Sequence, residues 1–105
     1  MKMVFTLATA EEMMEALGSR LRAQRLAQEI TQRELASMAG LSLGALRKLE
    51  HNGQTSLETL IRVVQALGLS ESLQDLFVPQ KNTIAQMEAA ERARQRQRAP
   101  RKAAS

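Results

Sequence analysis

Two adjacent cations near the middle of the chain, Arg47 and Lys48, carry the side chains best suited to bind an anion. They follow Leu43 and Gly44 by four residues each, in the segment LSLGALRKLE. Residues four apart share a face of an α-helix, so these four positions would line one side. Guanidinium and ammonium groups donate hydrogen bonds to phosphates and to base edges of DNA. The alternative is an ordinary solvated surface, but no acidic residue four positions away neutralises Lys48.

Other kinds of chemistry lack the residues that they need. The chain has no cysteine, and its one histidine, His51, cannot build a histidine-rich metal site. We find no carboxylate pair, no nucleophile beside a base and no phosphate-binding loop, so we expect neither enzymatic activity nor a cofactor. No apolar run approaches the roughly 18 residues of a membrane span, and the first residues lack the basic character of a signal peptide. We therefore expect a cytoplasmic protein with no metal site.

Capping residues mark where the helices begin. Thr9 with Glu12, and Thr31 with Glu34, have the spacing of capping boxes. Three more helices are expected to begin after Ser42, Ser56 and Ser70, and the helices after the first to end at Gly40, Gly53, Gly68 and Pro79. Strong helix formers dominate between these limits. The pattern predicts an all-α domain of five helices over residues 9–79.

The second and third predicted helices, 31–40 and 42–53, are short and meet at a glycine. Two such helices joined by about three residues form a helix-turn-helix, which presents its second helix to a DNA groove. The third helix would therefore be the recognition helix, with its cationic side outward.

Two charged residues continue the apolar faces of helices. The apolar stripe of the first helix consists of Met14, Leu17 and Leu21. Four residues further lies Arg25, and in the third helix Glu50 follows Leu46 and Leu49 on the inner side. A charge on an apolar face needs a partner of opposite sign. We therefore predict a structural ion pair between Arg25 and Glu50.

Both ends of the chain differ from the body. Residues 1–8 contain an alternating segment, Lys2–Leu7, typical of a strand that pairs with its copy in a dimer or lies loose. Residues 80–105 form a basic tail: from Lys81 onward 7 Lys/Arg stand against 2 Asp/Glu, whereas the preceding residues hold 8 against 9. The tail segment IAQMEAAERARQRQR is compatible with a helix and APRKAAS with disorder. The tail could follow DNA phosphates, bind an acidic protein surface or stay solvated.

The segment TQRELASMAGLSLGALRKLEHNG resembles the Cro/XRE-type helix-turn-helix family of bacterial and phage repressors, over about residues 18–69. The residues that carry the resemblance are Arg25 before ITQ, Gln32, Leu35, Ala36, Gly40, Ser42, Leu49 and Glu50. The resemblance implies that Gln32 touches a phosphate and braces the recognition helix, that Ser42 bonds a phosphate or base edge, and that His51 lies along the backbone. It places positions 43, 44, 47 and 48 in the major groove, and it also implies the Arg25–Glu50 pair.

Leu43 and Gly44 depart from the commonest pattern of that family, in which polar side chains stand at these positions. Leu43 offers only apolar contact, for instance with a thymine methyl, and Gly44 has no side chain to read a base. Direct readout would then fall on Arg47 and Lys48, with guanine as the expected partner. Sequence-dependent DNA shape would supply the rest.

One domain of this size reads one half-site. We therefore expect a homodimer on double-stranded DNA with a palindromic operator, whose half-sites lie about one helical turn apart. The candidate dimer residues, besides the N-terminal segment, are Leu73, Leu76, Phe77 and Val78. The first three could also close the core.

Within the family, the strand-like N-terminus and the basic tail are most similar to HipB-like antitoxin repressors. This likeness implies a repressor of its own toxin–antitoxin operon that also binds a HipA-like toxin kinase. No residue here forms a toxin-binding motif, so the resemblance alone carries that implication. Two alternatives stay open: a stand-alone phage-type or metabolic regulator without a protein partner, and a protein-interaction module that has lost DNA binding.

Overall fold

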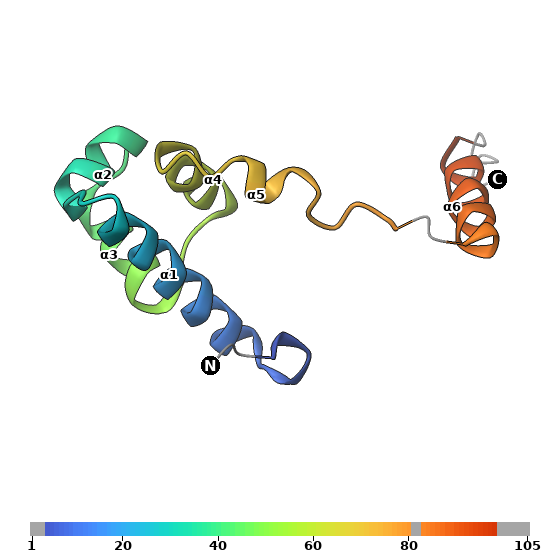
Figure 1. Ribbon diagram of the computed structural model, residues 1–105, viewed down its shortest axis with the longest axis horizontal. Helices are drawn as coiled ribbons and strands as arrows, with labels where there is room; N and C mark the ends of the chain where they lie inside the picture. Colours follow the sequence, from blue (N-terminus) through green and yellow to red (C-terminus); the bar gives the residue numbers. More distant parts are fainter. Residues whose placement is uncertain (1–3, 81–82, 99–105) are drawn as a thin grey trace, which may run out of the picture. The chain divides into compact units, whose positions relative to one another are not determined.

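A computed structural model describes residues 4–80 and 83–98, and within them the chain is helical with no β-strand (Figure 1). The elements are η1 (Phe5–Leu7), α1 (Ala10–Ala27), α2 (Gln32–Ala39), α3 (Leu43–Asn52), α4 (Leu57–Ala66), α5 (Glu71–Gln74) and α6 (Ile84–Arg98). The chain divides into two units, Met1–Gln74 and Asp75–Ser105. The all-α prediction is confirmed, and helices α1–α5 of the first unit correspond to the five that were expected.

Four of the five predicted helix starts, those of α1 to α4, are confirmed by their caps. Thr9 and Thr31 each accept a hydrogen bond from the glutamate three residues on, and each glutamate side chain accepts one from the cap backbone. In the first box, the Thr9 backbone N–H and hydroxyl lower the pKa of Glu12. Ser42 and Ser56 cap α3 and α4, accepting from Ala45 N–H and Thr59 N–H at 3.1 Å. Helix starts are thus fixed by local contacts that the sequence displays.

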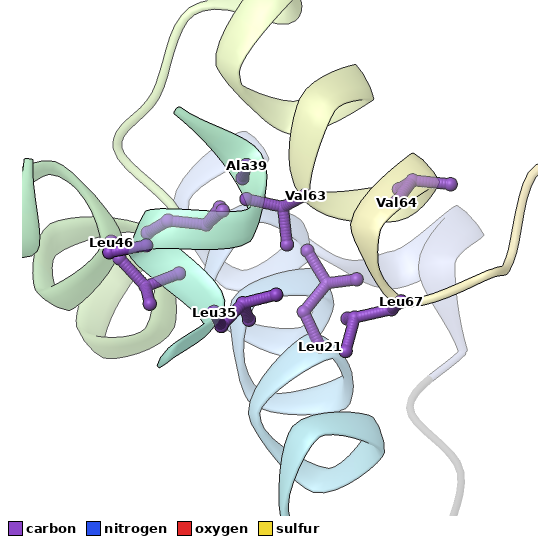
Figure 2. Close-up of a cluster of buried hydrophobic side chains, with 9 residues drawn as sticks. Leu21, Leu35, Ala39, Leu46, Val63, Val64 and Leu67 are labelled. Carbon is purple, nitrogen blue, oxygen red and sulfur yellow. The ribbon is translucent and has the colours of Figure 1, made fainter. Parts of the chain in front are cut away.

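Four helices contribute the core of the first unit. The most deeply buried side chains are Leu35, Leu46, Leu49 and Val63, from α2, α3 and α4. Figure 2 shows Leu21 of α1 beside Leu35 and Leu67 in the same cluster, which also includes Ala39 and Val64. Leu73 of α5 is half-buried and packs against this cluster.

The expected stripe on α1 is wrong at one position, because Leu17 is 41% exposed. The buried line of α1 instead runs through Gly18, Leu21 and Arg25, with Met14 half-buried. Leu17 lies one position, or about 100°, away from Gly18 and so falls at the edge of the packed face. The glycine, rather than the leucine, meets the neighbouring helix.

The predicted N-terminal strand is also wrong where the structure describes it. Phe5–Leu7 form a 3-10 turn, with Leu7 N–H donating to Val4 C=O and Ala8 N–H to Phe5 C=O, both at 3.1 Å. A lone strand leaves its backbone groups unpaired, whereas the turn pairs two of them locally. Arg20 lies 4.8 Å from the centre of the Phe5 ring, which anchors the turn to α1. Lys2 and Met3 of the predicted strand lie outside the described residues.

The fifth helix is shorter than expected. It covers Glu71–Gln74 only, and the chain turns away through Phe77, whose φ is 63°. Pro79 disfavours helical geometry at Val78, so a helix cannot continue up to the proline. Of the candidate dimer residues, Leu76, Phe77 and Val78 therefore stand on irregular chain and are exposed, Phe77 by 94%.

The second unit contains the basic helix α6. It covers Ile84–Arg98, the segment that the sequence left compatible with a helix, and Glu91 and Arg94 form an ion pair there. The final segment APRKAAS lies outside the described residues. Over residues 4–80 and 83–98 no helix is both long and apolar enough to cross a membrane.

Helices α1 and α3 approach each other at two glycines. A Cβ on Gly18 would overlap the carbonyl oxygen of Leu49 and stand 3.2 Å from the backbone N of Gly53. Gly53, at φ 74°, caps α3, and a Cβ there would overlap the carbonyl of Met14. Only the absence of a side chain allows this spacing, which brings the surface residues of α1 next to α3.

Replacement of Gly18 by Ala should therefore destabilise the fold by about 1–3 kcal/mol, because backbone atoms must move apart to admit the methyl group. Gly44→Ala is the matched control, since Gly44 is also helical but has nothing within 4 Å of the added carbon. Its higher helix propensity should leave stability unchanged or raise it by up to about 1 kcal/mol. Urea unfolding followed by circular dichroism measures both, and equal effects of the two substitutions would contradict the close packing of α1 on α3.

Candidate nucleic-acid interface

The turn between α2 and α3 is held by backbone geometry. Gly40 takes the left-handed conformation at φ 70°, which ends α2. Leu41 N–H then donates to Ala36 C=O at 2.8 Å, and Ser42 begins α3. The half-buried Leu41 side chain packs against the core. These contacts set the direction in which α3 leaves the turn and confirm the predicted helix-turn-helix.

A buried ion pair links α1 to α3. Arg25 Nε donates to Glu50 Oε2 at 2.7 Å, and Arg25 Nη2 donates to Glu50 Oε1 at 2.9 Å. Both residues are buried, with 6% and 5% exposure. The hydrogen bonds that Arg25 donates to Glu50 raise the pKa of Arg25, so the guanidinium keeps its charge despite burial. The pair expected from the two apolar stripes is present in the structure.

Two further hydrogen bonds tie the loop before α2 and the first residue of α2 into this pair. Arg25 Nη1 donates to Ile30 C=O at 2.9 Å, and Gln32 Nε2 donates to Glu50 Oε1 at 3.0 Å. In the described part of the chain no buried side-chain N or O atom lacks a hydrogen-bond partner. The network therefore satisfies the buried charges while joining α1, the start of α2 and α3. Gln32 has the bracing role that the family resemblance implies, and its contact with a phosphate stays a prediction.

The outer side of α3 carries most of the predicted contact residues. Gly44, Arg47, Lys48 and His51 are exposed, and so is the Ser42 cap. Leu43, by contrast, is half-buried rather than outward-facing. It precedes Glu50 by seven residues, close to two helical turns, so both lie on the same side of α3. Less of the Leu43 side chain is therefore available for the apolar contact with DNA that the sequence suggested.

Two hollows flank the exposed side of α3. The first, of about 530 Å³, brings Gln32, Arg47 and His51 together, and it is also lined by Glu50 and by Ser19 and Arg22 of α1. The second, of about 300 Å³, is lined by Ala45, Lys48, Gln54, Thr55, Ser56 and Thr59. Arg47 and Lys48 thus line different hollows.

Two residues of α1 that line the first hollow were missed by the sequence argument. Ser19 and Arg22 precede Arg25 at steps of three residues, so the sequence places them near it on one surface of α1. That spacing could have identified them only if the contact between α1 and α3 had been known.

The helix-turn-helix family model matches residues 21–74, slightly more than half of the chain. The chain therefore belongs to the Cro/C1-type, or XRE, helix-turn-helix family of DNA-binding regulators. A search of curated proteins finds no match to it. The match covers the last part of α1 and all of α2 to α5, and it begins after Ser19.

Removal of either partner of the buried pair should cost about 3–5 kcal/mol of folding stability, because the remaining charge is stranded in the interior. Arg25→Ala and Glu50→Ala test this by urea unfolding. The double variant Arg25→Met, Glu50→Leu should lose much less than the sum of the two single losses. The exposed Glu58–Arg62 pair of α4 is the control, and Arg62→Ala should cost no more than about 1 kcal/mol. Additive losses at positions 25 and 50 would contradict the pairing in solution.

Proposed function

We propose that the protein is a sequence-specific transcriptional repressor that inserts α3 into the major groove of duplex DNA. The observation that carries the proposal is the inward fixation of Glu50 by Arg25 and Gln32, which leaves Arg47 and Lys48 exposed on α3. The membership of the Cro/C1-type family supports the same placement. Binding alone accounts for this role, so we propose no enzymatic activity.

Base recognition depends on few side chains in this proposal. Arg47 or Lys48 hydrogen-bonds the major-groove edge of guanine, whose N7 and O6 both accept. Ser42 and Gln32 position the helix against phosphates, and His51 lies beside the backbone. Gly44 and the half-buried Leu43 add little direct readout. DNA shape therefore contributes much of the discrimination between operators.

The repressor acts as a two-fold dimer on a palindromic operator, since each chain carries one recognition helix. The exposed apolar side chains of Leu76, Phe77 and Val78 are the candidate dimer surface. Leu73, by contrast, packs against the core of its own chain.

Arg47→Ala and Lys48→Ala should both weaken operator binding. The variant that removes a base contact should lose about 1–3 kcal/mol per half-site. The measurement is a fluorescence-anisotropy titration with a palindromic duplex from the region upstream of its own gene. Arg62→Ala removes the same charge from a hollow between α2 and α4 and should bind like the wild type. If the wild type binds and neither α3 variant is weakened, α3 is not the recognition helix; if the wild type binds no duplex, the chain is a protein-interaction module.

The narrower hypothesis makes the protein the antitoxin of a toxin–antitoxin operon, bound to a HipA-like kinase. The resemblance to HipB-like repressors supports it through the basic tail, in which α6 is helical. The N-terminal strand that contributed to the resemblance is replaced by a 3-10 turn over Phe5–Leu7. The alternative is a stand-alone regulator with the same DNA site and no protein partner.

Expression of the full chain with its neighbouring gene should separate these two hypotheses. An antitoxin is expected to co-purify with the neighbouring product in a fixed ratio and to suppress its toxicity. A full chain that binds operator DNA but purifies alone, with a harmless neighbour, would instead be a stand-alone regulator. Size-exclusion chromatography with light scattering measures the ratio.

A further inference from the structure

The larger hollow beside α3 has one wall that the proposed function does not use. Ser19 and Arg22 of α1 line it opposite Arg47 and His51 of α3, around a volume of about 530 Å³. Ser19 precedes the residues matched by the helix-turn-helix family, and Arg22 lies near their beginning. The close approach at Gly18 brings this part of α1 against α3.

The lining of the hollow is cationic because its one acid is already paired. Both oxygens of Glu50 accept from Arg25, and Oε1 also accepts from Gln32. The ion pairs found in residues 4–80 and 83–98 are Arg25–Glu50, Glu58–Arg62 and Glu91–Arg94, so none of them involves Arg22 or Arg47. Two guanidinium groups therefore share one concave surface without a counter-charge from its lining.

The geometry of a groove-bound helix indicates which anion meets this surface. The major groove is about 12 Å wide, and a helix with its side chains measures about 10–12 Å across. A helix that fills the groove brings the surfaces on its flanks against the phosphates of the two strands. The Arg22 hollow is such a flank, whereas the outermost side of α3, with Lys48, faces the base edges.

We infer that this hollow binds a backbone phosphate of the DNA, held by Arg22 and Ser19 of α1 together with His51 of α3. The inference rests on the proposed function and adds α1 to the DNA-binding surface. Arg22 contributes a charge-assisted hydrogen bond, Ser19 a hydroxyl donor and His51 a ring N–H. Arg47 stands between this phosphate and the base edges, so Arg22 is the cation that serves the phosphate alone.

A phosphate contact predicts a uniform and salt-dependent loss on mutation. Arg22→Ala should weaken binding to the upstream palindromic duplex and to a scrambled duplex by the same factor, about tenfold. The slope of log K against log salt should fall by about one per protomer. Arg22→Lys keeps the charge and should keep most of the slope.

Arg20→Ala is the matched control, because Arg20 lies on the same helix but stands over the Phe5 ring instead of lining the hollow. It should leave affinity and slope unchanged. Thermal melting by circular dichroism confirms that the variants are folded, as expected for exposed positions.

Single methylphosphonate substitutions along the duplex locate the contact. One neutralised phosphate per half-site should weaken the wild type but not Arg22→Ala, whereas its neighbours should affect both proteins alike. Equal slopes for the wild type and Arg22→Ala, equal losses for Arg20→Ala and Arg22→Ala, or no phosphate coupled to Arg22 would each overturn the inference. A wild type that binds no duplex at all would overturn the proposed function as well, so the two failures are distinct.

Discussion

Arg25 reaches from α1 to hold the carboxylate of Glu50 on α3 through hydrogen bonds of 2.7 and 2.9 Å, both side chains being buried. A buried pair of this kind adds little net stability over an apolar pair, yet it tolerates only one arrangement of its partners. Because residues on a helix follow one another at about 100°, fixing Glu50 fixes the rotation of all of α3. Lys48 and Gly44 are then outward, Arg47 and His51 lie on one flank, and Leu43 turns inward.

The close contacts of α1 and α3 at two glycines bring Arg25 within hydrogen-bonding distance of Glu50. Gly18 admits the Leu49 carbonyl where any side chain would collide, and Gly53 admits the Met14 carbonyl in the same way. The two backbones therefore lie close enough for the Arg25 guanidinium to bond Glu50 directly. The same approach places Arg22 beside α3, so the packing that holds the recognition helix also shapes the surface next to it.

Charge placement matters more than total charge in this molecule. The residues up to Gln80 are nearly neutral, with 8 Lys/Arg against 9 Asp/Glu. A nearly neutral body binds DNA only if its cations gather on one surface while its acids are paired or lie elsewhere. Here Glu50 is neutralised internally and Glu58 is paired with Arg62 on α4, while Arg22, Arg47 and Lys48 border α3.

The sequence by itself determined the features that depend on near neighbours along the chain. The capping boxes at Thr9 and Thr31 and the left-handed ends at Gly40 and Gly53 follow from residues at most a few positions apart. The Arg25–Glu50 pair could also be predicted from the sequence. A charge on an apolar face needs a partner of opposite sign, and the apolar faces of the first and third helices each carry one charged residue.

Only the tertiary structure decided which of several equivalent positions meets a neighbour. By helical periodicity either Leu17 or Gly18 could lie on the buried face of α1. Gly18 is buried because the backbone of α3 packs directly against it. The alternation in the first residues reads as a strand, but with no partner in the chain Phe5–Leu7 bond locally as a turn. Arg22 and Ser19 line one hollow with Arg47, which lies about 25 positions further along the chain. No local sequence pattern predicts a contact over that separation.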